Sequence, residues 1–131
     1  GGTVYINQDD IRALQLAKSA VASAIELLLN KTNTTPEEID KVYLAGGFGT
    51  HMDANSAVAI GMLPDALRDK IRCVGNSSLA GASMALLSEG KKVELLEIKQ
   101  NSNYLELSGN SAFNNLFPEH MTFDKEESPW K

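Results

Sequence analysis

The sequence predicts an α/β fold, a short and mainly parallel sheet with flanking helices, and three observations support it. Two apolar segments, residues 42–45 and 71–74, are too short for helices, and each runs directly into glycine. A segment with helical character follows each of them, so the order strand, glycine turn, helix occurs twice. This repeated order implies parallel pairing through a right-handed crossover. A length of 131 residues with 43% hydrophobic and 22% charged residues is typical of one globular domain.

The first quarter of the chain predicts a long helix. A β-prone start at residues 4–6 leads into Asn7, whose side chain can cap a helix, while Asp9 and Asp10 complement the positive end of that helix. Apolar and small residues then recur at helical spacing and form a stripe that is expected to pack on the sheet: Ile11, Leu14, Ala17, Ala20, Val21, Ala24, Ile25 and Leu28. Residues 35–38 (Thr-Pro-Glu-Glu) are a capping box with proline at the first helical position, which predicts a second, short helix.

Two short helical segments are expected between the strands. Asp53 can cap a helix over residues 54–60, and Gly61 can end it. Pro64 then opens another helical turn before the second strand.

After the second strand, Ser77 or Ser78 is expected to cap a helix of small residues over 79–87, closed near Gly90. The rest of the chain predicts a helix at residues 92–100, a strand at 104–107 and a final helical turn or two at 112–117.

Composition excludes several classes of protein. The net charge of −5 has the wrong sign for a protein that grips a phosphate backbone, which argues against nucleic acid. No apolar segment approaches the ~20 residues of a membrane span, and the N-terminus lacks the features of a secretory signal. The single cysteine, Cys73, excludes an internal disulfide, a four-cysteine zinc site and an iron–sulfur cluster held by this chain alone. A lone thiol suits a reducing compartment, so we expect a cytoplasmic protein.

The candidate binding residues lie where the two predicted strands end. Gly46, Gly47 and Gly49 follow the first strand, and Gly75 and Asn76 follow the second. Ligands of open parallel sheets bind beyond the carboxyl ends of the strands, and glycine lets a flat or anionic ligand approach the backbone N–H groups. The alternative is that these glycines only make tight turns and close helix–sheet contacts. Two such turns at neighbouring strand ends favour a binding role.

No catalytic or metal-binding residue is predicted. The dinucleotide fingerprint, the phosphate loop and the nucleophile elbow are all absent from the glycine-rich segments. His51 and Asp53 are too few for a transition-metal site, and Asp53 has a sufficient role as a helix cap. Cys73 within a strand has the position of an inert core thiol. Three methionines are expected to fill the core: Met62, Met84 and Met121.

Several ordered segments carry a family resemblance. They are residues 6–12 (INQDDIR), 14–18 (LQLAK), 42–49 (VYLAGGFG), 60–64 (IGMLP) and 74–82 (VGNSSLAGA), and the likeness includes residues 105–109 (LELSG). Together they resemble the C-terminal region of the reductive activators of corrinoid proteins, over roughly residues 6–123. The resemblance implies a partial actin-like, ribonuclease H-like lobe of the acetate and sugar kinase, heat-shock and actin (ASKHA) superfamily. Residues 1–124 would form this part of an ATP-binding domain, and residues 125–131 a frayed tail.

The resemblance also implies a function. Such activators use ATP to return an inactive Co(II) corrinoid protein to the Co(I) form that methyltransferases need. Their [2Fe-2S] cluster lies in an N-terminal domain, and the lobe that holds magnesium and the phosphates is a separate part, so this chain would hold half of an ATP site. The implied adenosine-binding residues are Gly46, Gly47, Phe48, Gly49, Gly75 and Asn76. The intact protein would be an ATPase, and this chain alone would be inactive.

A second hypothesis is a non-catalytic interaction domain that docks a corrinoid protein or a second copy of itself. The strand at residues 42–45 contains no proline, and only Lys41 at its start opposes pairing of its edge with another chain. The segment 4–6 could also pair with another chain, so a homodimer is expected.

Overall fold

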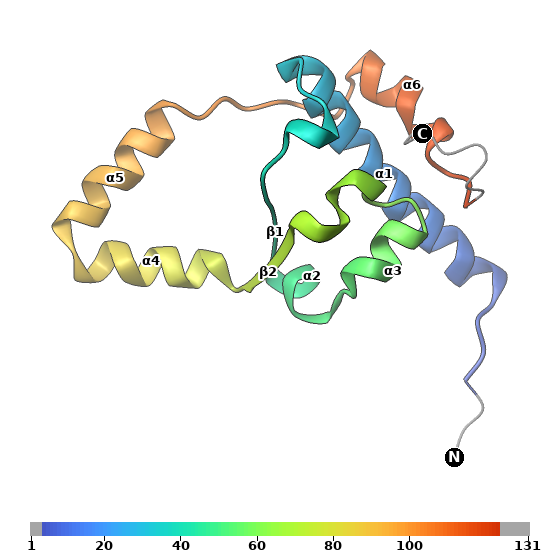
Figure 1. Cartoon of the computed structure of the whole chain (residues 1–131), viewed down its shortest axis with the longest axis horizontal. Coiled ribbons are helices and arrows are strands. Elements are labelled where there is room, and N and C mark those ends of the chain that lie inside the picture. The colour runs from blue at the N-terminus through green and yellow to red at the C-terminus, as the bar shows by residue number, and fades with distance from the viewer. Residues whose placement is uncertain (1–3, 124–131) are drawn as a thin grey trace.

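A computed structural model describes residues 4–123, so the expected frayed tail at residues 125–131 lies outside the described part. In chain order the elements are α1 (Gln8–Thr32), the 3-10 helix η1 (Pro36–Glu38), β1 (Val42–Ala45), α2 (Gly46–His51), α3 (Ala54–Ala59), the 3-10 helix η2 (Asp65–Lys70), β2 (Ile71–Gly75), α4 (Ser77–Leu87), α5 (Glu89–Gln100) and α6 (Ser111–Glu119). Helices α4 and α5 form an arm that extends away from the body (Figure 1). An extended segment then brings the chain back to α6, which packs beside α1.

The two strands form a parallel pair, which confirms the predicted α/β fold. Val42 lies opposite Ile71, and Ala45 lies opposite Gly75, with an irregularity between Leu44 and Ala45. Buried apolar side chains form the core beside this pair, with Val21, Ile25, Val42 and Leu44 packed against it: Ala57, Val58, Met62, Leu63 and Ile71.

The predicted caps at the first helices are confirmed. The Asp10 N–H donates to the Asn7 side chain at 2.9 Å, and the Asn7 N–H donates to the Asp10 carboxylate at 3.0 Å. The Thr35 N–H donates to Glu38 at 2.7 Å, and this capping box begins a 3-10 helix. The Asp53 carboxylate accepts from the Ser56 N–H at 2.8 Å and begins α3.

The predicted cap of α4 is wrong. Asn76, and neither Ser77 nor Ser78, accepts from the Leu79 N–H at 3.0 Å, so α4 begins at Ser77. Helix α4 ends at Leu87 because the next residue, Ser88, caps α5. Gly90 therefore lies in the first turn of α5 and does not close α4.

The expected strand at residues 104–107 is also wrong, because this segment has no strand partner among residues 4–123. Its local bonds instead involve Glu106, which accepts from the Tyr104 hydroxyl at 2.7 Å and from the Ser108 N–H at 2.9 Å. The final helix, expected at 112–117, is confirmed as α6.

The apolar stripe of α1 packs only in part as predicted. Val21 and Ile25 contact the core, but Ile11 and Leu14 at its start are exposed. Five residues of α1 are buried. Ala22 and Leu27 are apolar, whereas the other three are polar: Lys18, Ser19 and Ser23. Two other expectations of burial fail as well, since Cys73 and Met84 are exposed, whereas Met62 is in the core.

Two of the three buried polar residues of α1, Lys18 and Ser19, bind the C-terminal end of α6. The Lys18 ammonium donates to the carbonyl oxygen of His120 at 2.7 Å and to that of Thr122, and the Ser19 hydroxyl donates to the carbonyl oxygen of Phe117. His120 Nε2 lies 2.7 Å from the Glu26 carboxylate. The last carbonyl groups of a helix lack partners within it. Helix α1 supplies those partners for α6 from about a hundred residues away.

Candidate functional site

The six candidate residues lie together at one edge of the sheet, which we call the glycine edge: Gly46, Gly47, Phe48, Gly49, Gly75 and Asn76. Ala45 and Gly75 are register partners, so both chains leave the sheet side by side. Helix α2 packs against both strands, which keeps its glycines close to the end of β2. The structure therefore brings together residues that are some thirty positions apart in the sequence.

A left-handed glycine stands at the end of each strand: Gly46 directly follows β1, and Gly75 is the last residue of β2. Gly46 has a φ of 66° and Gly75 a φ of 61°. Residues other than glycine rarely adopt this backbone conformation, because their Cβ atom then crowds the backbone. The two glycines thus let β1 and β2 turn out of the sheet in the same way.

The glycine-rich segment after β1 differs from the prediction, because it is a helix and not an open turn. Helix α2 begins at Gly46, directly after the strand, and the Thr50 hydroxyl donates back to the Gly46 carbonyl oxygen at 3.0 Å. His51, in the last turn of α2, is exposed.

Gly47 and Gly49 have different surroundings. A Cβ atom on Gly49 would lie 2.1 Å from the Leu44 carbonyl oxygen and 3.3 Å from the Gly75 nitrogen. Glycine is therefore required at position 49 so that α2 can pack on the strand ends. A Cβ atom on Gly47 would meet nothing within 4 Å, and its φ is not positive. Packing explains Gly49, whereas Gly47 leaves open space at the surface of the glycine edge.

The polar groups near the glycine edge have structural partners. The Asn76 side-chain oxygen caps α4, as described above. Ser56 donates to Asp53 from both its hydroxyl, at 2.6 Å, and its backbone N–H, and these hydrogen bonds lower the pKa of the Asp53 carboxyl. Asp53 therefore acts as a helix cap, as the sequence predicts.

Metal ligands do not gather anywhere in residues 4–123: no group of three or more His, Cys, Asp or Glu residues there could hold a metal ion. None of the helices in that part of the chain is both long enough and apolar enough to span a membrane.

Comparison with known proteins identifies the family. Residues 1–131 match the protein family described as the C-terminal domain of RACo, the ASKHA domain. The chain belongs to this family. The match covers every residue of the chain, so the glycine edge, the α4–α5 arm and α6 are all parts of this RACo C-terminal ASKHA domain.

Individual relatives agree with the family. The chain is 31% identical over 113 residues to the "Corrinoid activation enzyme RamQ" of Eubacterium limosum, which covers 86% of this chain and 19% of RamQ. It is 27% identical over 119 residues to the "[Co(II) methylated amine-specific corrinoid protein] reductase" of Methanosarcina barkeri, which covers 89% of this chain and 22% of that protein. A solved structure, "Reductive activator for corrinoid,iron-sulfur protein", matches with a TM-score of 0.82 and 38% identity, over 95% of this chain and 20% of that one.

These matches confirm the resemblance to the reductive activators of corrinoid proteins and the fold that it implies. The chain spans about a fifth of the length of each of these relatives.

Proposed function

We propose that this chain is the nucleotide-binding C-terminal part of an ATP-dependent reductive activator, which restores Co(II) corrinoid proteins to Co(I) for methyl transfer. The main support for this proposal is the match of the whole chain to the RACo C-terminal ASKHA domain. The names of three relatives describe activation or reduction of corrinoid proteins, and they support a corrinoid protein as the partner.

The glycine edge is the proposed contact for adenosine. Gly46, Gly47, Phe48 and Gly49 would contact the nucleotide along the backbone of α2, with Gly75 and Asn76 beside them. The open space at Gly47 and the shared position of the two strand ends support this assignment. A backbone surface of this kind suits the base and sugar, whereas the triphosphate and its magnesium ion also need charged groups, which we assign to polypeptide outside this chain.

The electron-transfer cofactor is also assigned to polypeptide outside this chain. A [2Fe-2S] cluster requires four ligands, and Cys73 is the only cysteine of these 131 residues. We propose that the cluster lies in a separate N-terminal domain. The activator would work in the reducing cytoplasm, where a free thiol such as Cys73 persists.

Nucleotide titration of this chain tests the site. We expect ADP to cause chemical-shift changes that map to residues 46–49 and 75–76, with weak affinity because half of the site is absent. Gly47→Val fills the open space without requiring a positive φ, so it should abolish these changes and leave the fold intact. Gly81→Val, also at an open helical glycine but in α4, is the matched control and should leave them unchanged. Shifts that map instead to α6 would contradict the assignment.

Metal analysis tests the assignment of the cluster to another part of the protein. We expect the purified 131-residue chain to be colourless and to hold no stoichiometric iron or zinc, because one cysteine and two histidines provide too few ligands. About one tightly held metal ion per chain, measured by elemental analysis, would show that this expectation is wrong.

A second candidate function, an interaction or dimerisation domain, is favoured by the exposed N-terminal segment. Val4, Tyr5 and Ile6 are 94%, 78% and 75% exposed and belong to no strand. Each strand of the described sheet has one neighbour, so each has an edge without a strand partner among residues 4–123. Such edges can pair with another chain.

We therefore expect the chain to form a homodimer, in which segment 4–6 adds to a strand edge of the second copy. Light scattering over a range of concentrations should show a mass that rises toward twice that of the chain. A monomeric mass at the highest concentration would rule out this pairing.

A further inference from the structure

The α4–α5 arm exposes large apolar side chains along both of its helices. No residue of α4 or α5 is buried. Within residues 4–123 each of these helices has the other as its main packing neighbour. Figure 1 shows the arm extending from the end of β2 and returning through an extended segment. Large apolar side chains are exposed along both helices: Leu79, Met84, Leu86, Leu87, Val93, Leu95, Leu96 and Ile98.

Helix α4 exposes apolar side chains on opposite sides. It contains no charged residue between Ser77 and Leu87. Met84 is 57% exposed and Leu86 is 81% exposed, although two residues of an α-helix are about 200° apart around its axis. A helix that is apolar all round is typical of the interior of a larger fold. An isolated helix of this length is also marginal in water, so α4 needs cover on more than one side.

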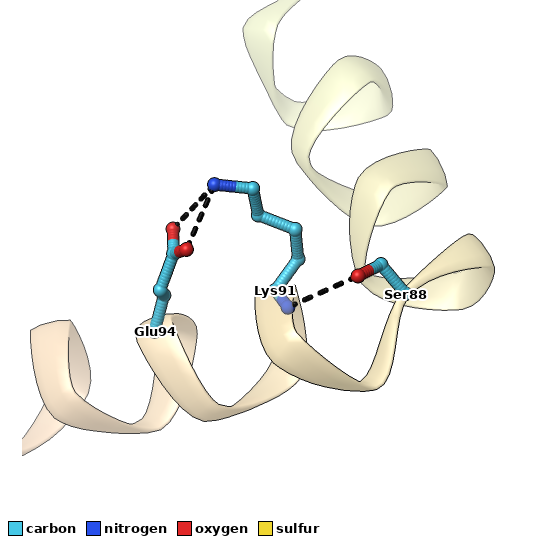
Figure 2. A network of polar contacts seen from close by, with 3 residues as sticks. All are labelled: Ser88, Lys91 and Glu94. Atoms are coloured by element: carbon cyan, nitrogen blue, oxygen red, sulfur yellow. Dashed lines mark hydrogen bonds and ion pairs between the residues drawn. The ribbon is translucent and has the colours of Figure 1, made fainter.

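Helix α5 carries charged residues beside its apolar ones, and these charged residues indicate where the solvent lies. Lys91 forms an ion pair with Glu94 at 2.7 Å, and Lys92 forms one with Glu89 at 2.6 Å. Figure 2 shows the first pair beside Ser88, whose hydroxyl accepts from the Lys91 N–H and caps the helix. Charged pairs of this kind stabilise little but remain hydrated. The charged surface of α5 is therefore a solvent face of the arm, and α4 is the part that requires cover.

The solved reductive activator contains a counterpart of most of this chain within a longer polypeptide. It matches 95% of this chain, and the unmatched part is shorter than α4 alone. This chain in turn covers 20% of that protein, so four-fifths of that polypeptide lies outside the matched region. A partner that dissociates would leave the apolar arm in water, where contiguous apolar surface promotes aggregation. A partner that docks on one face would cover Met84 or Leu86 but not both.

We propose that α4 is an internal helix of a larger fold, covered on opposite faces by polypeptide of the same protein that lies outside these 131 residues, with α5 shielding it from solvent. We expect the covering surface to be apolar, because α4 carries no charged residue. This inference concerns packing and does not depend on nucleotide binding at the glycine edge.

Thiol accessibility tests the proposal. Leu86→Cys and Met84→Cys, each made with Cys73→Ser, are compared in the 131-residue chain and in the polypeptide extended to the length of its relatives. We expect both thiols to react with a maleimide rapidly in the short chain and at least about tenfold more slowly in the extended one. Lys99→Cys, on the charged helix α5, should react rapidly in both. Hydrogen exchange of the unsubstituted proteins gives a second measurement, in which the α4 amides should be protected only in the extended polypeptide.

Two results would overturn the proposal. Equally fast reaction of both thiols in the short and the extended polypeptide would show that nothing in the same protein covers α4. Protection that rises with concentration in the short chain, or that appears in the extended protein only after a corrinoid protein is added, would assign the cover to a second copy or to that partner.

Discussion

Gly49→Ala is expected to destabilise the chain by about 3 kcal/mol or more, because a side chain at this position has no room. Its Cβ atom would lie 2.1 Å from the Leu44 carbonyl oxygen and 2.7 Å from the Leu44 carbonyl carbon. Both atoms belong to the backbone of β1, so the clash can be relieved only if α2 moves away from the sheet. Thermal unfolding should show a Tm lowered by roughly 10 °C.

Gly47→Ala is the matched control for this prediction. It lies two residues earlier in the same helix, has open space around the added atom and needs no positive φ. Alanine is a better helix former than glycine, so its effect should stay within about 1 kcal/mol and can be stabilising. Equal loss of stability in both variants would show that close packing at Gly49 is not what holds α2 against the strands.

Lys18→Met is expected to release α6 from α1 at a cost of about 1–3 kcal/mol, because it removes a buried charged donor from two carbonyl oxygens. The substitution keeps most of the side-chain volume, so it tests the hydrogen bonds and not the packing. Lys18 is 4% exposed, and its ammonium contacts the His120 and Thr122 carbonyl oxygens. Hydrogen exchange should show faster exchange of the α6 amides, while Lys31→Met, at an exposed position of α1, leaves them unchanged.

The pH dependence of stability provides a readout specific to Lys18. Burial lowers the pKa of the Lys18 ammonium below its ordinary value of 10.5. Between the lowered pKa and 10.5 the unfolded chain binds more protons than the folded one, so the contribution of Lys18 to the free energy of unfolding rises with pH in this window. The stability difference between the wild type and Lys18→Met should therefore increase toward pH 10. A difference that falls over the same range would contradict the lowered pKa.

Local signals in the sequence predicted most of the sheet and the early helices. The strands Val42–Ala45 and Ile71–Gly75 are short apolar segments that end at glycine. Asn7, Thr35 and Asp53 each cap the helix that follows them directly in the sequence. These features depend on contacts within four residues, so a sequence displays them directly. The glycine edge could be predicted as well, because the parallel pairing of two recognised strands places Gly46 next to the end of β2.

Features that depend on distant contacts could not be predicted in this way. Lys18, Ser19 and Ser23 look like a solvent face of α1, yet all three are buried, and the carbonyl groups that bind Lys18 and Ser19 lie about a hundred residues away. Cys73 and Met84 look like core residues but are exposed, because burial depends on which segments pack against them and not on their residue type alone. Nothing in the sequence distinguishes Gly49, where a side chain would clash, from Gly47, where it would not. Their difference depends on how closely α2 approaches Leu44.

ATP-dependent formation of Co(I) tests most directly whether the glycine edge binds the nucleotide that drives corrinoid reduction. The polypeptide extended to the length of its relatives is mixed with a Co(II) corrinoid protein, a chemical one-electron donor and ATP, and the corrinoid absorption spectrum is followed. We predict ATP-dependent accumulation of Co(I) with the wild type and with Lys99→Gln, a control on the charged helix α5, and its loss with Gly47→Val. Undiminished ATP-dependent reduction by a folded Gly47→Val protein would contradict nucleotide binding at the glycine edge.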